Sequence, residues 1–333
     1  MHSLTIIGAG IWGTALAVQF AGRGCKVNLW GRNQTLMEKM ASTRYNQAYL
    51  PDTRLPDEIT CHQDFATAVA KGHILLLVTP TATIRQLIQD ISPILNERHQ
   101  GIAWACKGVE ADSGCWIHEI VSETLGSELP LAAVSGPSFA HEVAAGLPTA
   151  LVIACEQKPF ADTLAGLLHG DKLRVYTTDD MVGVECGGAL KNILAIAAGI
   201  AEGLALGENA KAALITRGIN EAIRFTEAVG GRAETIVGLA GIGDIVLSCA
   251  SSQSRNQNFG RMIVEYGGAG KAREQNTKVI EGMDATRAVL KIANRHKIEM
   301  PICEQIALIL DDRIHAKAAV EQLLQRQASF RSQ

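Results

Sequence analysis

The sequence predicts an α/β protein whose N-terminal domain is built on one wide sheet and whose C-terminal domain is entirely helical. Three observations carry this prediction. A strand, a glycine-rich turn and a helix follow one another at the start of the chain. Short strand-like runs then alternate with helical stretches up to Thr178, and only helical patterns follow Met181. We therefore expect two domains, residues 1–180 and residues 181–333.

The composition indicates a protein with a large core and without the net positive charge that would attract polyanions. The 333 residues are 47% hydrophobic and 20% charged, which is enough apolar material for about two domains. A formal net charge of −3 argues against nucleic acid and anionic membrane surfaces as partners. Any anionic ligand must therefore be held by a few local cations.

Eight cysteines are scattered singly, at positions 25, 61, 106, 115, 155, 186, 249 and 303. Because no CxxC pair and no cysteine–histidine cluster with metal spacing occurs, we expect mostly reduced core thiols and no metal site. The N-terminus lacks the basic start and apolar block of an export signal, so we expect a cytoplasmic location.

The run from Met181 to Leu206 is long and apolar enough to resemble a membrane span. Four polar or charged residues interrupt it: Glu185, Lys191, Asn192 and Glu202. Charges inside a bilayer are costly, so this pattern favours a buried helix of a folded core. We do not expect the protein to be embedded in a membrane.

The first strand, Ser3–Ile7, runs into the glycine turn Gly8-Ala9-Gly10-Ile11-Trp12-Gly13 and then a helix. A second strand, Lys26–Trp30, completes the unit, and in this context the GxGxxG pattern indicates a Rossmann-type, dinucleotide-binding domain. Gly8 permits the tight turn, Gly10 lets a pyrophosphate approach the backbone, and Gly13 lets helix and strand pack closely. Free N–H groups at the helix N-terminus would then face the phosphates.

The residues after the second strand bear on which cofactor binds. A carboxylate at this place would bind the ribose 2′-hydroxyl of NAD, but the chain has Trp30-Gly31-Arg32-Asn33. Arg32 is suited to a 2′-phosphate, so NADP(H) is favoured and NAD(H) stays open. The alternative is a solvated arginine in a surface loop.

Further strands are predicted within the first domain from short β-prone runs bounded by turns. They lie at 73–78, 101–106, 131–134, 150–154 and 173–177. The first of these is apolar throughout, as expected for a central strand that is covered on both faces. The helices predicted for the second domain cover 181–205, 209–229, 242–250, 254–266, 284–296, 302–311 and 315–326.

Lys191 is the anomalous residue of the first helix in the second domain. Its neighbours three and four residues away are Gly187, Gly188, Leu194 and Ala195, none of which can pair with a cation. Either the ammonium group extends into water, or it finds a partner elsewhere in the fold and serves as an acid or base. The glycines around it indicate that another group approaches closely.

Four loops can bring polar groups to the carboxyl ends of the strands or to the start of a helix. They contain Lys107 after a strand, Ser138 where an N-cap is expected, Asp244 after three glycines, and Arg255 in a polar loop where it could bind a phosphate. The first three have structural alternatives: Lys107 as a surface lysine, Ser138 as a cap, and Asp244 as a cap favourable to the helix dipole.

Together these segments resemble bacterial NAD(P)-dependent glycerol-3-phosphate dehydrogenases over nearly the whole chain. The resemblance is carried by the glycine turn, Lys107-Gly108, Ser135-Gly136-Pro137-Ser138-Phe139-Ala140, Gly187-Gly188-Ala189-Leu190-Lys191-Asn192 and Ser254-Arg255-Asn256. One departure is Cys106, where the family pattern has threonine. The resemblance implies reversible reduction of dihydroxyacetone phosphate to sn-glycerol 3-phosphate, a phospholipid precursor, by a cytoplasmic and often dimeric enzyme.

The resemblance also implies roles for individual residues. Lys191 is the implied proton acceptor. The implied substrate contacts, besides Lys191, are Lys107, Gly136, Ser138, Asp244, Ser254, Arg255 and Asn256. The implied cofactor contacts, besides Gly8, Gly10 and Gly13, are Ile11, Trp12, Arg32, Tyr49, Lys107, Ala140, Arg255, Val279 and Glu281.

On this basis we expect Lys191 to donate a proton to the alkoxide that develops at the substrate carbonyl, and to accept it in reverse. Asp244 either orients Lys191 or accepts a hydrogen bond from a substrate hydroxyl. Two alternatives remain for the function. One is a β-hydroxyacid or phosphogluconate type of dehydrogenase, and the other is an NADP-binding sensor without chemistry.

Overall fold

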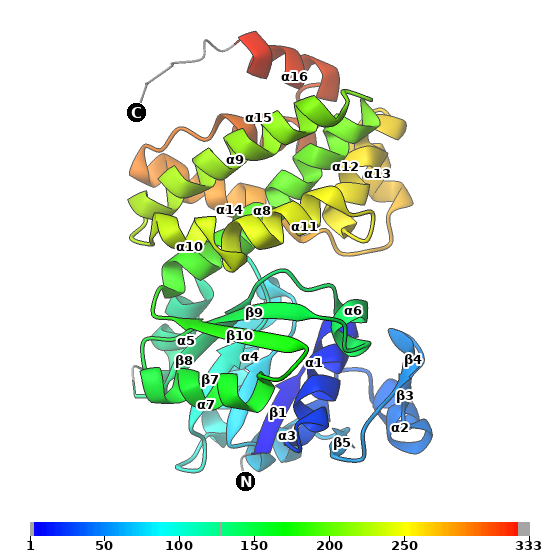
Figure 1. Cartoon of the computed structure of the whole chain (residues 1–333), viewed down its shortest axis with the longest axis vertical. Coiled ribbons are helices and arrows are strands. Elements are labelled where there is room, and N and C mark those ends of the chain that lie inside the picture. Colours follow the sequence, from blue (N-terminus) through cyan, green and yellow to red (C-terminus); the bar gives the residue numbers. More distant parts are fainter. Residues whose placement is uncertain (1–2, 127, 326–333) are drawn as a thin grey trace. The chain divides into compact units, whose positions relative to one another are not determined.

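The computed structural model describes residues 3–126 and 128–325. Two compact units make up the chain (Figure 1). The first contains the chain up to Lys107 together with Cys115–Glu185, and the second contains Gly108–Gly114 and the chain from Cys186 onward. The second unit thus takes up a short segment that lies, in the sequence, inside the first. The boundary expected at residue 180 stays a prediction.

The first unit is organised around an eight-stranded sheet with the order β10-β9-β8-β7-β6-β1-β2-β5. Its strands are β1 (Ser3–Ile7), β2 (Lys26–Trp30), β5 (Ile59–His62), β6 (Ile74–Leu77), β7 (Gly101–Trp104), β8 (Leu131–Ser135), β9 (Thr149–Ala154) and β10 (Leu173–Thr178). All neighbours pair in parallel except β8 and β9, which are antiparallel. The strand order reverses at β1, so the carboxyl ends of β1 and β6 flank the position where such sheets bind ligands.

Strand β1 shows how this sheet buries both of its faces. Leu4 and Ile6 belong to one core cluster with residues of α1 (Ile11–Gly22) and α7 (Lys158–Leu168). The alternate residue Thr5 is also fully buried, and its hydroxyl donates to the Ala68 carbonyl of α3 (Phe65–Lys71). Successive side chains of a strand point to opposite faces, so helices cover the sheet on both sides.

All seven predicted strands are present, with ends that differ by at most two residues. Three elements were missed: β5 and the hairpin of β3 (Tyr45–Asn46) and β4 (Leu50–Arg54). These strands are short, and β4 contains Pro51 and two charged residues, so its composition does not indicate a strand. The remaining helices of this unit are α2 (Gln34–Thr43), α4 (Ile84–Ile91), α5 (Ile117–Leu125) and α6 (Ala140–Ala144).

The second unit is helical, and no strand follows β10 among the described residues. Its helices are α8 (Met181–Gly203, of which Met181–Glu185 belong to the first unit), α9 (Glu208–Ala228), α10 (Ala233–Val237), α11 (Asp244–Ala250), α12 (Arg255–Glu265), α13 (Ala269–Gln275), α14 (Glu281–His296), α15 (Pro301–Leu310) and α16 (Ala316–Gln325). The predicted helices are all found, although residue 326 of the last lies outside the described residues. The short α10 and α13 were missed, and a π-helical turn, η3 (Leu239–Gly243), precedes α11.

Helix α8 is the only described helix that is long and apolar enough to cross a membrane, but 94% of its apolar window is buried inside the protein. Glycines let it pack closely against its neighbours. A Cβ atom added at Gly199 would lie 1.9 Å from the Gln257 carbonyl oxygen of α12, and one added at Gly260 would lie 2.2 Å from the Ile196 carbonyl oxygen. The helix therefore has the burial of a core helix, as predicted.

All eight cysteines are reduced thiols, and five of them are buried, as predicted. Burial raises the pKa of several thiols, for example that of Cys249 to about 12. Across the residues that the structure describes, no group of three or more histidine, cysteine or acidic side chains could hold a metal ion.

Glu221 of α9 is an unusual charged group because only 3% of it is exposed. Its carboxylate accepts the backbone N–H of Ile302 at 2.8 Å and that of Cys303 at 3.5 Å, and so caps the N-terminus of α15. Burial nevertheless raises the pKa of Glu221 to about 7, because the N–H donors and Arg224 offset the desolvation only in part.

This raised pKa predicts a pH-dependent stability. A carboxyl whose folded pKa exceeds its unfolded value contributes stability that is fully present below the unfolded pKa and is lost as pH rises through the folded pKa. For Glu221 the loss falls between its ordinary 4.5 and about 7, and it corresponds to roughly 3 kcal/mol.

We expect Glu221→Gln to flatten the pH dependence of the free energy of unfolding between about pH 4.5 and pH 7, because an amide keeps an acceptor for the Ile302 N–H and does not ionise. Urea unfolding at several pH values measures this. Glu265→Gln, on an exposed residue of α12, is the matched control. A Glu221→Gln protein that loses as much stability as the parent over this range would contradict the assignment.

Candidate active site

The glycine turn after β1 places its three glycines in different surroundings. A Cβ atom added at Gly8 would lie 2.2 Å from the Val78 carbonyl oxygen, and one added at Gly13 would lie 1.8 Å from the carbonyl oxygen of Gly8. Around Gly10, by contrast, an added Cβ atom would meet nothing within 4 Å. Gly8 and Gly13 therefore permit close packing within the protein, and Gly10 leaves open space beside the backbone.

The start of α1 fits the pyrophosphate of a dinucleotide. Gly10 is its N-cap and no side chain caps the helix, so the first N–H groups of this 12-residue helix are not bonded by a cap side chain. The first turn also contains no acidic residue. A helix N-terminus with free donors and no competing carboxylate favours an anion, and Gly10 adds room for it to approach.

The other predicted cofactor residues of this unit lie around the same edge of the sheet. Ile11 and Trp12 form the first turn of α1, where the Trp12 indole donates to the Ala105 carbonyl oxygen at 3.2 Å. Arg32 is exposed just beyond β2, and Tyr49 is 48% exposed in the β3–β4 turn. No acidic residue occurs between Trp30 and α2, so the end of β2 lacks the carboxylate that would repel a 2′-phosphate.

Lys107 and Ser138 converge on one backbone group. The Lys107 ammonium donates to the Gly136 carbonyl oxygen at 3.1 Å, and the Ser138 hydroxyl donates to the same oxygen at 3.0 Å. Gly136 has φ +116°, which only glycine adopts readily. The prediction that Ser138 is an N-cap is wrong: Phe139 occupies the N-cap of α6, without a side-chain bond, and Ala140 follows as its first residue.

In the second unit, Lys191 pairs with Asp244, a residue outside its own helix. Its ammonium donates to the Asp244 carboxylate at 2.9 Å, and the side chains are 15% and 1% exposed. Asp244 is the first residue of α11, and the Ser248 hydroxyl one turn later lies 3.5 Å from the same carboxylate oxygen. Of the two duties expected for Asp244, the structure contains the contact needed for orienting Lys191.

The glycines near Lys191 explain how this pair forms. A Cβ atom added at Gly187 would lie 2.3 Å from the Ala240 carbonyl oxygen of η3. The close approach expected at these glycines is therefore present, but the approaching group at Gly187 is backbone of the same unit. This contact brings the segment before Asp244 against α8.

The loop from Ser254 to Asn256 begins α12, and its three residues differ in exposure. The Ser254 hydroxyl caps the helix by accepting the Gln257 N–H, and Ser254 is buried. The Arg255 side chain is 48% exposed and lies 3.4 Å from the Glu281 carboxylate at the start of α14. Val279, two residues earlier, is 57% exposed. Arg255, Glu281 and Val279 are thus available at one surface of this unit.

Asn256 is buried and occupied on both ends of its amide. Its Nδ2 donates to Asn192 Oδ1 at 2.9 Å, and its Oδ1 accepts the backbone N–H of Gly282 at 3.0 Å. This chain of bonds joins α8, α12 and α14, beginning at the residue after Lys191. Asn192 was not predicted as a site residue, although a buried asparagine in an apolar helix is a signal for such a bond.

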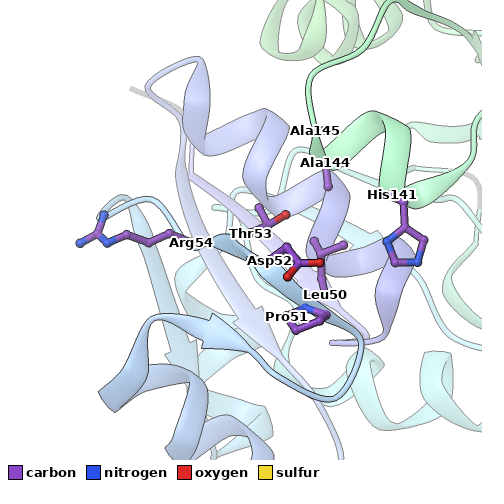
Figure 2. A pocket seen from close by; sticks show the side chains of 8 residues that line it. All are labelled: Leu50, Pro51, Asp52, Thr53, Arg54, His141, Ala144 and Ala145. Atoms are coloured by element: carbon purple, nitrogen blue, oxygen red, sulfur yellow. The ribbon is translucent and has the colours of Figure 1, made fainter.

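A separate pocket of about 430 Å³ lies on the first unit between β4 and α6. Figure 2 shows His141 on α6 facing strand β4, while Arg54 extends away from the other lining residues. None of its lining residues was predicted as a site residue. Two of them, Leu50 and His141, directly follow the predicted cofactor contacts Tyr49 and Ala140.

Two family models together match nearly the whole chain. Residues 3–161 match the N-terminal model of NAD-dependent glycerol-3-phosphate dehydrogenase, and residues 180–321 match its C-terminal model. The chain belongs to the NAD-dependent glycerol-3-phosphate dehydrogenase family. The boundary between the two models falls between residues 161 and 180, close to where the helical region begins.

Individual members of this family match over their full length. A glycerol-3-phosphate dehydrogenase (NAD(P)+) of Serratia proteamaculans is 44% identical over 97% of this chain and 96% of its own. That of Herminiimonas arsenicoxydans is 45% identical over 98% of both chains. The crystal structure of glycerol-3-phosphate dehydrogenase from Coxiella burnetii superposes with a TM-score of 0.93 at 41% identity, covering 98% of this chain and 99% of that one.

These matches confirm the predicted α/β fold and the resemblance to this family. They support neither a β-hydroxyacid or phosphogluconate dehydrogenase nor a sensor. The predicted site residues form two groups, one on each unit: Gly8, Gly10, Ile11, Trp12, Gly13, Arg32, Tyr49, Lys107, Gly136, Ser138 and Ala140 on the first, and Lys191, Asp244, Ser254, Arg255, Asn256, Val279 and Glu281 on the second.

The different surroundings of Gly10 and Gly13 predict opposite effects of the same substitution. Gly10→Ser should keep the free energy of unfolding within about 0.5 kcal/mol of that of the parent protein, because serine is a good N-cap and its Cβ atom meets open space. It should weaken NADPH binding at least about tenfold, because the side chain occupies the approach to the helix N-terminus.

Gly13→Ser is the matched comparison, since its Cβ atom would collide with the Gly8 carbonyl oxygen. It should lower stability by about 1–3 kcal/mol or more. Thermal unfolding and a fluorescence titration with NADPH measure both effects. Equal destabilisation by the two substitutions, or unchanged NADPH affinity in Gly10→Ser, would contradict the proposed division of roles.

Proposed function

We propose that the protein catalyses the reversible conversion of dihydroxyacetone phosphate to sn-glycerol 3-phosphate with NAD(P)H. The observation that carries this proposal is the pair of Lys191 and Asp244, a buried acid–base candidate in a chain that belongs to the glycerol-3-phosphate dehydrogenase family. The bound nicotinamide supplies the hydride. The residues of this chain bind the two ligands, orient them and move the proton.

Lys191 is the proposed proton donor and acceptor. As an ammonium group it donates a proton to the substrate oxygen while negative charge develops there, and as an amine it takes a proton from the alcohol in reverse. Asp244 holds the ammonium group at a defined position through the 2.9 Å contact. A positioned proton donor needs no reorganisation during the reaction, and this supports a catalytic role.

Arg255 is the proposed clamp for the substrate phosphate. Its side chain is half-exposed and its contact with Glu281 is long, at 3.4 Å, so guanidinium donors remain for a ligand. Lys107, with Ser138 and Gly136, forms the second set of proposed substrate contacts. Lys107 and Arg255 also contact the cofactor in this proposal, as do Ala140, Val279 and Glu281.

The proposed contact of Asn256 with the substrate is the least direct of these assignments. Both ends of its amide already bond within the protein, to Asn192 and Gly282. One amide hydrogen of Nδ2 is left for a ligand. We propose that Asn256 and Ser254 act chiefly by fixing the start of α12, on which Arg255 lies.

We further propose NADP(H) as the preferred cofactor, a cytoplasmic location, a homodimeric assembly and a role in supplying the glycerol phosphate of phospholipids. The cofactor preference is supported by the exposed Arg32 and by the lack of a carboxylate between β2 and α2.

The proposed reaction is tested by mixing the protein with dihydroxyacetone phosphate and NADPH, or NADH, and following the loss of reduced-nicotinamide absorbance. We expect turnover with both cofactors. Lys191→Ala should lower kcat about 10²–10⁴-fold, the usual range for a general acid, with NADPH affinity near that of the parent. Near-normal turnover of this variant would overturn the role of Lys191.

Two controls accompany that experiment. Lys191→Ala leaves Asp244 buried without its ion-pair partner, which is destabilising, so Lys191→Ala combined with Asp244→Asn tests whether lost folding explains lost turnover. Lys271→Ala removes an exposed lysine of α13 and should leave activity unchanged. If the unsubstituted protein oxidises neither cofactor, the proposed reaction itself falls.

Arg32→Ala should shift the cofactor preference. A charge-assisted hydrogen bond to a phosphate is worth about 1.5–3 kcal/mol, so the ratio of kcat/KM for NADPH to that for NADH should fall about 10–100-fold. Lys39→Ala, on an exposed residue of α2, is the control. An unchanged ratio in Arg32→Ala would refute the contact with the 2′-phosphate.

A further inference from the structure

A seven-residue segment, Gly108–Gly114, departs from the order of the sequence. We name it the strap. It lies in the chain between β7 and α5, which are elements of the first unit, but it groups with the second unit. Lys107, the residue immediately before the strap, belongs to the first unit.

Both ends of the strap are glycines with left-handed backbone conformations. Gly108 has φ +135° and Gly114 has φ +75°. A residue with a Cβ atom is strained at these angles, whereas glycine adopts them freely. The chain can therefore turn sharply where it enters the strap and again where it leaves.

The strap is held on α14 by two cations. The Lys291 ammonium donates to the Asp112 carbonyl oxygen, and the Arg295 guanidinium donates to the Ser113 carbonyl oxygen at 3.1 Å. These donors lie four residues apart and so on the same face of the helix. Val109 is buried, and a bond from the Gly114 N–H to the Glu110 carbonyl oxygen, at 2.8 Å, closes a turn inside the strap.

The chain on both sides of the strap is also held in place. Before it, the Lys107 carbonyl accepts from the Thr81 hydroxyl at 3.2 Å and the Lys107 ammonium donates to Gly136. After it, the buried Glu185 carboxylate accepts the His118 N–H at 3.2 Å at the start of α5. The peptide bond between Lys107 and Gly108 joins this held residue directly to the strap.

We propose that the strap positions Lys107, and that Lys291 and Arg295 are positioning residues for the reaction through it. This inference rests on the proposed role of Lys107 in binding substrate and cofactor. A shift of about 1 Å in a substrate-positioning group can lower the rate by about a hundredfold. Lys291 and Arg295, which are not among the proposed ligand contacts, therefore influence turnover through Lys107.

Helix α14 carries both the anchors of the strap and the partner of the proposed phosphate clamp. Its first residue, Glu281, pairs with Arg255, and its last two turns carry Lys291 and Arg295. A helix transmits a displacement along its axis as a nearly rigid element. The proposed phosphate clamp and the anchors of the strap are thus attached to one helix.

The test compares Lys291→Ala combined with Arg295→Ala, the anchor variant, with a matched control. Arg287→Ala removes another exposed cation of α14, whose contact with Asp311 is 3.9 Å long and exposed. The anchor variant should lower kcat/KM for dihydroxyacetone phosphate about tenfold, with an unchanged melting temperature, and Arg287→Ala should not. Lys291→Arg combined with Arg295→Lys should restore most of the activity, because both cations are kept.

The same substitutions in a Lys107→Ala background separate positioning from a general structural effect. If the anchors act through Lys107, removing them from Lys107→Ala protein should lower kcat/KM less than twofold. A full tenfold loss in that background, or no loss in the parent, would overturn the inference.

Hydrogen exchange gives a readout that does not depend on activity. Amides of the peptide spanning residues 107–116 should exchange faster in the anchor variant than in the parent or in Arg287→Ala. Unchanged exchange would also overturn the inference. If the parent protein does not reduce dihydroxyacetone phosphate at all, the proposed function fails, and the exchange experiment alone then decides whether the anchors hold the strap and Lys107.

Discussion

The ion pair of Lys191 and Asp244 is the interaction around which the helical unit is arranged. Asp244 is 1% exposed and Lys191 is 15% exposed, so removing the ammonium group from the buried carboxylate would cost about 3–5 kcal/mol. The pair can form only if α8 and the start of α11 lie close together, which Gly187 permits by admitting the backbone of η3. The same contact also fixes the position of the ammonium group that is proposed to transfer the proton.

Glycine serves two purposes in this protein, and the structure separates them. Gly8, Gly13, Gly187 and Gly199 admit neighbouring backbone, so a side chain there would separate packed elements. Gly10 differs because the space beside it is open. The three glycines of the GxGxxG motif look equivalent in the sequence, but in the structure Gly8 and Gly13 serve packing, and Gly10 is the one proposed to admit the pyrophosphate.

The proposed functional side chains are held by further hydrogen bonds and an ion pair. The Gly136 carbonyl accepts from both Lys107 and Ser138. The bonds between Asn192, Asn256 and Gly282 join three helices, beginning at the residue after Lys191, and Glu281 pairs with Arg255. Reacting groups require positions accurate to a fraction of an ångström, and such second contacts provide them. The strap extends this pattern to Lys107, through cations on a helix distant in sequence.

The sequence by itself determined the order of most elements, the dinucleotide-binding turn and the family, because periodicity, turn chemistry and motifs are short-range signals. It also marked Lys191 as a charge without a local partner. Only the tertiary structure decided what completes these features. Asp244 lies 53 residues from Lys191, the strap anchors lie 179 and 182 residues from their acceptors, and Ser138 bonds to Gly136 instead of capping a helix. Hydrogen bonds and close packing between distant segments depend on the folded arrangement of the chain, which local patterns do not contain.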